Sequence, residues 1–437
     1  MLLTPEEIRT LQRKLYRKAK LEPSYRFYAL YDKVYREDIL SHAYALVRSK
    51  KGAPGADGVS FEDIESDEGV ETLLAKLRED LRNKKYRADA VCRVWIPKPH
   101  GKKRPLGIPT IRDRVAQMAV KIVIEPIFES DFCDCSYGFR PKKSAHNAID
   151  DIADGLHKGY GQVIDADLAK YFDTIPHAKL IAVLAERIAD GRILALIKQW
   201  LKVPVVEEDE TGRRCIHGGK GNRRGTPQGG VISPLLANLY LQILDRVWKR
   251  NDLTSRLQTR LVRYADDVVL LCAGPVREPM EMLKNILDRL DLSLNEEKTK
   301  VLNSWEESFG FLGFRVVLRK SKRSGKFYPH VEPSKESIQR IKERVKGLTT
   351  RRMTPVPLPE LMKKLNETLR GWSGYFHYRN CTTSFNEVKW YVEERVRTHL
   401  RKRHKIESRA MGYERFPNKV LYNRYGLFKL PTTAGWT

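Results

Sequence analysis

Apolar residues follow two different periods along this chain. Between about residue 90 and residue 317, short apolar runs occur at VCRVWIPK (91–98), GQVIDADL (161–168) and VVLLCAG (268–274). They alternate with longer segments, such as 111–128, 233–250 and 279–292, in which apolar residues recur every three or four positions. The short runs are typical of buried strands and the longer segments of amphipathic helices. This alternation predicts an α+β domain.

The segments on either side of this region have a helical pattern and many basic residues. Residues 1–49 predict a basic helical extension, which ends at KKGAPGADGVS (50–60), where three glycines and a proline predict a loop. Beyond residue 333 the strand pattern fades, and KESIQRIKERVKGL (335–348) and WYVEERVRTHLRKRHK (390–405) predict helices. We therefore expect three parts, at 1–49, 50–317 and 333–437.

The charge balance narrows the class of partner. The chain has 437 residues, with 81 Lys and Arg against 55 Asp and Glu and a net charge of +26, which favours a polyanion such as nucleic acid. No stretch reaches the ~18 apolar residues of a spanning helix, and the opening residues lack a signal-peptide core, so we expect a cytoplasmic protein without a membrane partner. The six cysteines form no CxxC pair, which argues against a zinc module or a disulfide framework.

Two acidic segments carry the candidate chemistry. In VIDADLAKYFD (163–173), Asp165 and Asp167 fall on one face of a strand because side chains alternate with a period of two. In RYADDVVLL (263–271), Asp266 and Asp267 precede an apolar run, which is a poor place for two uncompensated charges. A lone Asp pair is usually a solvated turn. Two such segments together fit a site for two Mg²⁺ ions, which prefer oxygen ligands and can promote phosphoryl transfer.

Seen together and in this order, several segments resemble the motif series of reverse transcriptases encoded by group II introns. The resemblance spans about residues 50–317. It rests on IPKPHGKKRPLGIPTIRDRVAQ (96–117), SYGFRPKKSAHNAI (136–149), DADLAKYFD (165–173), RRGTPQGGVISPLLANLYL (223–241), YADD (264–267), LSLNEEKTKVL (292–302) and FGFLGF (309–314). It implies a right-hand polymerase, with fingers and palm built on antiparallel sheet, followed by a basic helical thumb or maturase domain.

The resemblance also implies roles for individual residues. The catalytic and metal-binding residues would be Asp167, Asp266 and Asp267, and Asp165 is the neighbouring carboxylate of the same strand. Phe172 would crowd a ribose 2′-hydroxyl. The nucleotide-binding residues would be Lys98, Lys103, Arg104, Arg112, Phe172, Gln228 and Lys298. The residues that bind RNA or DNA would be Tyr137, Arg140, Arg397, Arg401, Lys402 and Arg403.

The segment LNETLRGWSGYFHYRN (365–380) resembles the family's maturase domain, which grips structured intron RNA. By their helical spacing, Trp372, Tyr375 and Phe376 are more consistent with a hydrophobic core than with base stacking. The dense cations of RTHLRKRHK (397–405) are the stronger candidates for RNA contact in this part of the chain.

The favoured hypothesis is an RNA-directed DNA polymerase that uses two Mg²⁺ ions and also binds its intron RNA, assisting splicing and mobility by retrohoming. Its partners would be intron RNA, an RNA template with a DNA or RNA primer, and dNTPs, with a homodimer as a further possibility. Two alternatives stay open. One is a related reverse transcriptase used for host defence or repair, and the other is a non-catalytic maturase that only binds intron RNA.

Overall fold

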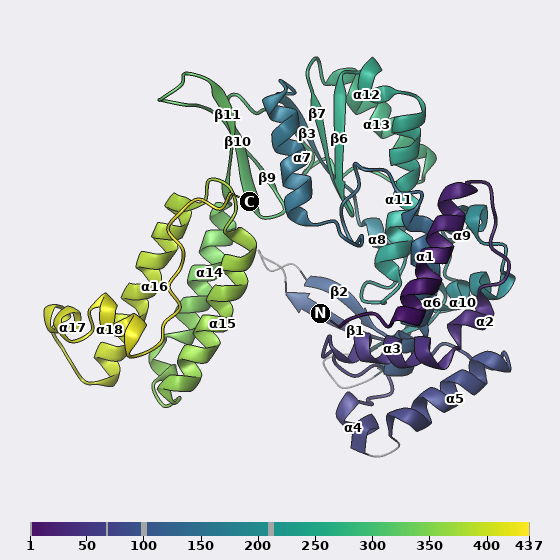
Figure 1. Ribbon diagram of the computed structural model, residues 1–437, viewed down its shortest axis with the longest axis horizontal. Helices are drawn as coiled ribbons and strands as arrows, with labels where there is room; N and C mark the ends of the chain where they lie inside the picture. The colour runs from purple at the N-terminus through teal and green to yellow at the C-terminus, as the bar shows by residue number, and fades with distance from the viewer. Residues whose placement is uncertain (1, 67–68, 98–102, 209–213, 437) are drawn as a thin grey trace. The chain divides into compact units, whose positions relative to one another are not determined.

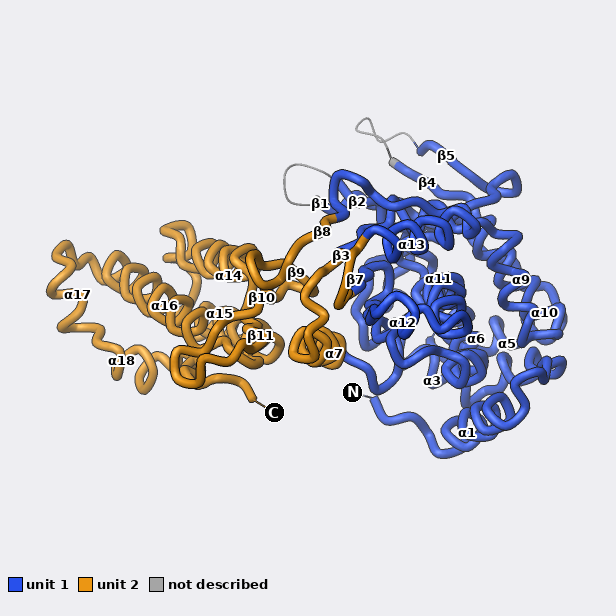
Figure 2. The backbone as a smooth tube through the Cα atoms, turned by 90° about the horizontal axis from the view of Figure 1, so that it is seen from above, with its two compact units in different colours: residues 1–144, 165–270, 277–299 blue, residues 145–164, 271–276, 300–437 orange. Residues whose placement is uncertain are grey.

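The computed structural model describes residues 2–66, 69–97, 103–208 and 214–436, which form two compact units of mixed helix and strand. The first unit consists of residues 1–144, 165–270 and 277–299, and the second of residues 145–164, 271–276 and 300–437 (Figure 2). The division passes through strands β3 and β7, so the chain crosses between the units several times.

Helices are the main secondary structure of the first unit (Figure 1). The two longest are α6, with 19 residues, and α11, with 18, and most of their side chains are buried. Thr110 caps α6 by accepting a hydrogen bond from the Asp113 N–H, and a proline lies in the first turn of α11. The helices are α1 (Glu6–Leu21), α2 (Tyr31–Val34), α3 (Glu37–Arg48), α4 (Phe61–Ser66), α5 (Val70–Arg82), α6 (Ile111–Glu129), α8 (Tyr171–Thr174), α9 (His177–Arg187), α10 (Gly191–Leu201), α11 (Ser233–Arg250), α12 (Leu253–Arg256) and α13 (Arg277–Arg289).

One sheet of the first unit has the strand order β2-β1-β4-β5. Its strands are β1 (Val91–Pro97), β2 (Lys103–Ile108), β4 (Pro204–Glu208) and β5 (Arg214–Gly218). The β1–β2 and β4–β5 pairs are antiparallel, and the short β1–β4 pair is parallel. The sheet therefore joins two hairpins that lie about a hundred residues apart in the sequence.

A second sheet has the order β6-β7-β3-β8 and carries the acidic segments. Its strands are β3 (Gln162–Asp167), β6 (Thr259–Tyr264), β7 (Asp267–Cys272) and β8 (Lys300–Asn303). After its first residue, β7 is fully buried, in agreement with its uninterrupted apolar sequence. Strands β7 and β3 are neighbours in this sheet, so the two acidic segments lie on adjacent strands.

The second unit combines a three-stranded sheet with a helical bundle. The sheet order is β11-β10-β9, and both of its strand pairs are antiparallel. The strands of this sheet are β9 (Phe309–Phe311), β10 (Phe314–Lys320) and β11 (Phe327–Pro333). The helices of the second unit are α7 (Ala145–His157), α14 (Lys335–Leu348), a 3-10 helix (Arg351–Met353), α15 (Leu358–Phe376), α16 (Thr382–Arg403), α17 (Arg409–Arg415) and α18 (Asn418–Asn423).

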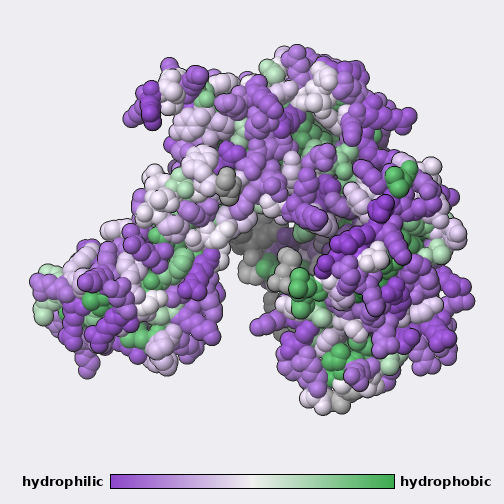
Figure 3. Space-filling model, viewed as in Figure 1, coloured by the Kyte–Doolittle hydropathy of each residue, from purple (hydrophilic) through white to green (hydrophobic). Residues whose placement is uncertain are grey.

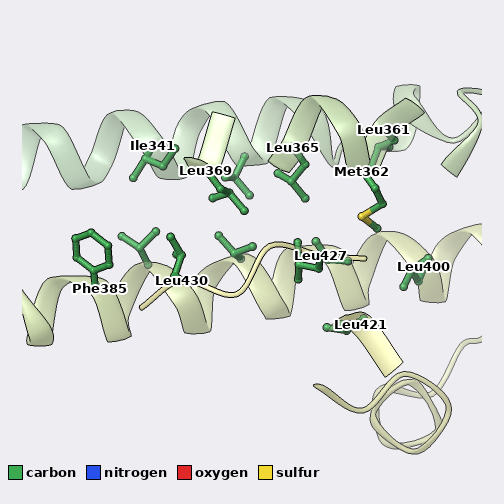
Figure 4. Packing of buried hydrophobic residues seen from close by; sticks show 14 of the residues in the cluster. Ile341, Leu361, Met362, Leu365, Leu369, Phe385, Leu400, Leu421, Leu427 and Leu430 are labelled. Atoms are coloured by element: carbon green, nitrogen blue, oxygen red, sulfur yellow. The ribbon is translucent and has the colours of Figure 1, made fainter. Parts of the chain in front are cut away.

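Helices α14, α15 and α16 pack around one hydrophobic core, which the chain after α18 closes with Leu427 and Leu430 (Figure 4). Trp372 and Phe376 pack against this core, and the Tyr375 hydroxyl donates a hydrogen bond to the Leu312 carbonyl at 2.9 Å. The prediction that these aromatic residues belong to a core is confirmed for Trp372 and Phe376.

The predicted elements agree with the structure in type and closely in extent. The helix expected at 335–348 is α14, and the one expected at 233–250 is α11. The α+β prediction is confirmed, although the parallel β1–β4 pair shows that one sheet is mixed and not purely antiparallel. All six cysteines are free thiols. In the described part of the chain, no helix is both long and apolar enough to cross a membrane.

Candidate active site

The turn between β6 and β7 presents the first pair of carboxylates. Only Ala265 and Asp266 separate the two strands, and Ala265 has a φ of 57°, in the left-handed region that a tight hairpin turn requires. Asp267 is the first residue of β7 and lies at its exposed end, directly before five buried residues. The sequence YADD therefore folds as a rigid turn at the edge of a buried strand.

A fully buried ion pair between Arg263 and Asp245 stabilises this turn. Arg263, on β6, donates to both carboxylate oxygens of Asp245, with the shortest distance 2.5 Å, and neither side chain is exposed. The same guanidinium donates to the Ala265 carbonyl at 2.9 Å and to the Asn238 side chain at 3.0 Å. Arg263 therefore positions the backbone of the turn. No role was predicted for this residue from the sequence. The signal that could have revealed it is an arginine that follows the apolar pair Leu261 and Val262 directly, inside a strand, TRLVRY, that is mostly buried.

The SYGFRP segment lies against the same turn. The Tyr137 N–H donates to the Arg263 carbonyl at 2.8 Å, and the Asn238 side chain donates to the Gly138 carbonyl at 2.5 Å. A Cβ atom added to Gly138 would lie 2.3 Å from the Ala265 nitrogen, so only glycine allows this approach. The motif thus has a steric role in fixing the turn.

Replacement of Gly138 with alanine tests this close packing. We expect Gly138→Ala to lower the free energy of unfolding by about 1–3 kcal/mol, because backbone atoms of the turn must move to accept the methyl group. The measurement is denaturant unfolding of the two variants Gly138→Ala and Gly191→Ala. Gly191, the first residue of α10, is the control because a Cβ there would meet no atom within 4 Å. Equal stability of the two variants would contradict the steric role.

The end of β3 supplies the second pair of carboxylates. Asp165 and Asp167 lie two residues apart in the strand, so they share one face. The Asp167 carbonyl accepts from the Asn295 N–H at 2.7 Å, which ties this strand end to the segment before β8. That segment also carries Lys298, whose Nζ lies 3.2 Å from an Asp167 carboxylate oxygen. Two residues that the sequence analysis assigned to different roles, Asp167 and Lys298, therefore meet, although they lie 131 positions apart in the sequence.

The acidic side chains are close enough to affect one another's ionisation. The pKa of Asp267 is raised to about 7. The largest cause is the surrounding protein, which shields this carboxylate from water although part of the residue is exposed. Repulsion by neighbouring carboxylates raises the pKa further, and Lys298 partly offsets it. These neighbours are Asp266, Asp165 and Asp167.

This concentration of negative charge fits a divalent cation. Carboxylate oxygens are the donors that Mg²⁺ prefers, and such ions are commonly shared with substrate phosphates. Among the residues that the structure describes, no group of three or more His, Cys, Asp and Glu side chains is placed so that it could hold a metal ion. Mg²⁺ is usually held by one or two carboxylates together with substrate phosphates, so the donors of this site suit a cation that the substrate helps to bind.

A pH effect on stability follows from the raised pKa of Asp267. In metal-free buffer, the folded chain retains a proton at Asp267 up to about pH 7, whereas the unfolded chain loses it near the ordinary pKa of an aspartate, 3.8. This position therefore lowers stability as pH rises through that window. We expect Asp267→Asn to melt at a higher temperature than the wild type at pH 8 in EDTA, and the difference to shrink towards pH 4. Thermal melts of Asp288→Asn, which removes an exposed carboxylate of α13, provide the control. The same pH trend in both variants would contradict the assignment.

A second group of predicted residues is assembled around the TPQGG loop. The Arg104 Nε donates to the Gln228 side-chain oxygen at 2.7 Å. The Gly107 N–H donates to the Gln228 carbonyl at 2.5 Å, and the Thr226 N–H donates to the Phe172 carbonyl at 2.7 Å. Hydrogen bonds thus connect the loop to β2 on one side and to α8 on the other. The structure brings Arg104, Gln228 and Phe172 together as one connected group.

The remaining candidates for nucleotide binding differ in their accessibility. Lys103 is exposed at the start of β2, whereas Lys98 lies outside the described residues. Arg112 is tied to its own unit: its guanidinium donates to Asp80 at 2.8 Å and lies 4.7 Å from the Tyr86 ring centroid. The structure therefore gives Arg112 a stabilising role in the fold.

In the SYGFRP motif, the exposed residue differs from the expected ones. Tyr137 and Arg140 are both only 8% exposed, and the Arg140 guanidinium is bound by Glu129 and by the Ser136 carbonyl. Phe139, in contrast, is 50% exposed, and its ring centroid lies 6.4 Å from that of Tyr264 in the YADD turn. The predicted contacts of Tyr137 and Arg140 with nucleic acid do not fit this burial, and Phe139 is the accessible ring.

The basic cluster of α16 is also divided by burial. Arg397 is 5% exposed, and it donates to the Phe416 carbonyl at 3.0 Å, so its predicted contact with RNA does not fit the structure. Arg403 donates to the Thr354 and Val356 carbonyls, and Arg401 donates to the Glu407 carbonyl. Lys402 is exposed. Arg401 and Arg403 retain partial exposure, so this end of the helix stays accessible in part.

Comparison with known families agrees with this geometry. Residues 96–316 match the family "Reverse transcriptase (RNA-dependent DNA polymerase)", and residues 338–416 match the family "Group II intron, maturase-specific domain". The first match includes both acidic segments and the TPQGG loop.

Individual relatives point to the same family. The Escherichia coli (strain K12) protein YkfC is 35% identical over 352 residues, which cover 72% of this chain and 90% of YkfC. The group II intron-encoded protein LtrA of Lactococcus lactis subsp. cremoris is 34% identical over 73% of this chain, and the chain spans about half (51%) of LtrA. A solved telomerase structure from Candida albicans covers 76% of this chain and 63% of its own with 13% identity and a TM-score of 0.43, which carries no inference about function.

The fold and the two matched families define a right-hand reverse transcriptase, an RNA-directed DNA polymerase, with a helical domain after its polymerase part. Within this class, the chain belongs to the group II intron-encoded reverse transcriptases with a maturase domain.

Proposed function

We propose that this chain copies RNA into DNA with two divalent cations, and that it binds its own intron RNA to assist splicing and retrohoming. The observation that carries the polymerase proposal is the approach of the β3 carboxylates to the YADD turn, where burial and, after it, repulsion by these carboxylates and Asp266 raise the pKa of Asp267 to about 7. We assign residues 50–317 to fingers and palm, residues 333–437 to the thumb or maturase domain, and residues 1–49 to an N-terminal extension.

Asp167, Asp266 and Asp267 would hold the cations. When bound, these ions would activate the primer hydroxyl and stabilise the leaving pyrophosphate. Lys298 places a positive charge 3.2 Å from Asp167, which limits repulsion at the β3 end and provides a donor for phosphate oxygens. Without cations, the mutual repulsion of the carboxylates disfavours the fully ionised site, so cation binding and full ionisation should reinforce each other.

The second group of residues is suited to hold the incoming nucleotide. Lys103 and Arg104 lie on one strand and can pair with triphosphate oxygens, while the hydrogen bond from Arg104 fixes the Gln228 side chain. Phe172 is 8% exposed, and its carbonyl accepts a hydrogen bond from the Thr226 N–H, so its backbone is fixed and its buried ring would not easily move away from a ribose 2′-hydroxyl. This rigidity favours deoxynucleotides.

A cavity beside the TPQGG loop is suited to the template strand. Its volume is about 370 Å³, and its lining is largely apolar with cations at Lys50 and Lys121, whereas Arg114 in the same lining is buried and donates to the Pro109 and Ala53 carbonyls. It is bounded by Leu106 and Gly229, which belong to β2 and to the loop. A flat base can pack on such a wall while cations neutralise the adjacent phosphates.

The proposed binding of intron RNA is based on the helical domain. Its helices present many exposed cations, including Lys402 at the end of α16 and Lys346 in the last turn of α14. Contacts of this kind bind RNA phosphates with little dependence on sequence and weaken strongly with salt. Splicing of the cognate intron RNA at increasing salt, with and without the protein, would test this binding separately from polymerisation.

Primer extension tests the polymerase proposal. The purified chain, given Mg²⁺, dNTPs and a DNA primer on an RNA template, should extend the primer, and EDTA should stop the reaction. Complete absence of extension on RNA templates, by protein shown to be folded from its thermal melt, would overturn the proposal.

Sugar selection offers a more specific prediction. Phe172→Val should raise the efficiency of rNTP incorporation relative to dNTP incorporation by roughly ten-fold or more, because the smaller side chain leaves room for the 2′-hydroxyl. The measurement is kcat/KM for the two nucleotides with the same template. Tyr171→Phe serves as the control, because the adjacent Tyr171 hydroxyl donates to the Ala237 carbonyl and its loss leaves Phe172 in place. An unchanged ratio in Phe172→Val would contradict the role.

A further inference from the structure

The β10–β11 hairpin has a tip to which no role has yet been assigned. The strands pair in register up to Lys320 opposite Phe327, and residues 321–326 form the turn. The Ser321 N–H donates to the Lys326 carbonyl at 2.8 Å, and Gly325 has a φ of 68°. The tip falls between the two segments that match known families, 96–316 and 338–416. Neither match therefore gives it a function.

This tip carries dense positive charge. Five cations lie within eight residues, all of them are exposed, and no acidic residue occurs between Glu307 and Glu332. Arg319 lies 3.6 Å from the Glu332 carboxylate, whereas the other four cations have no ion pair among the residues that the structure describes. The strongly hydrophilic end of this hairpin is visible in Figure 3. The cations are Arg319, Lys320, Lys322, Arg323 and Lys326.

Two exposed aromatic rings lie beside these cations. Phe327 is 44% exposed and Trp305 is 42% exposed, and their ring centroids are 4.8 Å apart with planes at 82°. Rings that stay accessible in this way offer flat apolar surface to a partner. Their edge-to-face contact leaves each ring with a face that can receive a base.

The Trp305 ring is held in place by the fold. A Cβ on Gly161 would lie 2.0 Å from the indole Nε1, so this glycine leaves the space that the indole occupies. The neighbouring Ser304 donates from both its N–H and its hydroxyl to the Gly161 carbonyl, and the Leu318 N–H donates to the Ser304 carbonyl at 3.0 Å. The ring is thus anchored to β10 and to the residue before β3, and little conformational entropy would be lost on stacking.

We propose that this tip and the Trp305–Phe327 pair form a binding site for an unpaired segment of RNA. Bases stack on the rings, and the phosphates pair with Lys320, Lys322, Arg323 and Lys326. The RNA is single-stranded because a duplex hides the faces of its bases. The choice of RNA over DNA rests on the proposed function, which supplies the chain with structured and template RNA.

A charged tip can also serve a simpler purpose. Lysines at the end of an exposed hairpin prevent edge-to-edge pairing with another chain. That purpose requires no exposed aromatic pair and predicts no preference for unpaired RNA. An acidic protein partner would use the cations but not the ring faces.

Photocrosslinking separates these possibilities. The probe is a single-stranded RNA of about a dozen nucleotides that contains 4-thiouridine, and crosslinked peptides of the full chain are identified by mass spectrometry. The tip variant is Lys320→Ala/Lys322→Ala/Arg323→Ala/Lys326→Ala, and the ring variant is Phe327→Ala. The control removes four exposed cations from α11, α12 and α13: Lys249→Ala/Arg250→Ala/Arg256→Ala/Lys284→Ala.

We expect the wild type and the control to crosslink at Trp305 or Phe327, and the tip variant to lose these crosslinks. A plot of log affinity against log salt has a negative slope. In the tip variant this slope should become less steep by roughly two to three more than in the control, because four phosphate contacts are lost. Phe327→Ala should weaken binding of the probe by about ten-fold. Thermal melts establish that each variant is folded.

Three results would overturn the proposal: crosslinks elsewhere only, equal losses in the tip and control variants, or equal or tighter binding of duplex RNA or single-stranded DNA of the same sequence. The polymerase proposal is tested by a different measurement, primer extension on a short template, which should be unchanged in the tip variant. A wild type that crosslinks but does not extend primers would refute only the polymerase function.

Discussion

Asp266→Asn combined with Asp267→Asn should abolish primer extension, with a loss in kcat of roughly 1,000-fold or more. The reason is that the two carboxylates at the β6–β7 turn would provide the anionic oxygens for cations that stabilise the transition state by several kcal/mol. Asparagine has nearly the same shape, so the turn and its support by Arg263 should survive. The metal-free double variant should even be somewhat more stable at pH 8, since its repulsive charges are gone.

Glu306→Gln combined with Glu307→Gln is the matched control, because it neutralises another adjacent acidic pair that is exposed in the loop after β8. Single-turnover extension on one RNA template compares the two double variants with the wild type. Extension by the Asp266/Asp267 variant within ten-fold of the wild type would refute the catalytic assignment. An equal loss in the control would show that total charge, and not the site, determines the rate.

Asp245→Ala should cost about 3–5 kcal/mol of stability, the second large effect that we predict. The variant leaves the Arg263 guanidinium fully buried without its carboxylate, although Asn238 and the Ala265 carbonyl still accept from it. Since Arg263 also fixes the YADD turn, extension activity should fall together with stability.

The control for Asp245→Ala lies on the next residue of the same helix. Arg246 pairs with Glu186 at 2.6 Å, but both side chains are about half exposed (51% and 49%), so Arg246→Ala should cost less than about 1 kcal/mol. Replacing both members of the buried pair, as Asp245→Leu with Arg263→Met, should cost less than Asp245→Ala alone. Urea unfolding measures all three variants. Similar losses for Asp245→Ala and Arg246→Ala would contradict the importance of burial.

The local elements could be predicted because their signals are local. The period of apolar residues marks α11 and α14 to the residue, and the apolar run after Asp267 marks β7. The proximity of Asp167 to the YADD turn could be predicted only from the resemblance to a family, since no local pattern reports that β3 and β7 are neighbours.

Burial of cations could not be predicted from the sequence. Arg140, Arg397 and Lys402 all belong to basic motifs, yet only Lys402 is exposed. Which side of α16 faces the core depends on how the helices pack, and its cations are distributed around the helix. Arg397 reaches the core because Phe416, in a later segment of the chain, offers a carbonyl to its guanidinium. Such long-range partners leave no trace in a short motif.

Iron-mediated cleavage would show most directly whether the two acidic segments form one cation site. Fe²⁺ bound in place of Mg²⁺ generates hydroxyl radicals in the presence of ascorbate and peroxide, and these cut the nearby backbone. We predict cuts both near residues 165–167 and near residues 264–268, and we predict that excess Mg²⁺ or the Asp266→Asn/Asp267→Asn substitutions suppress both sets together. Cuts at only one of the two segments, or cuts that persist in the double variant, would contradict a shared site.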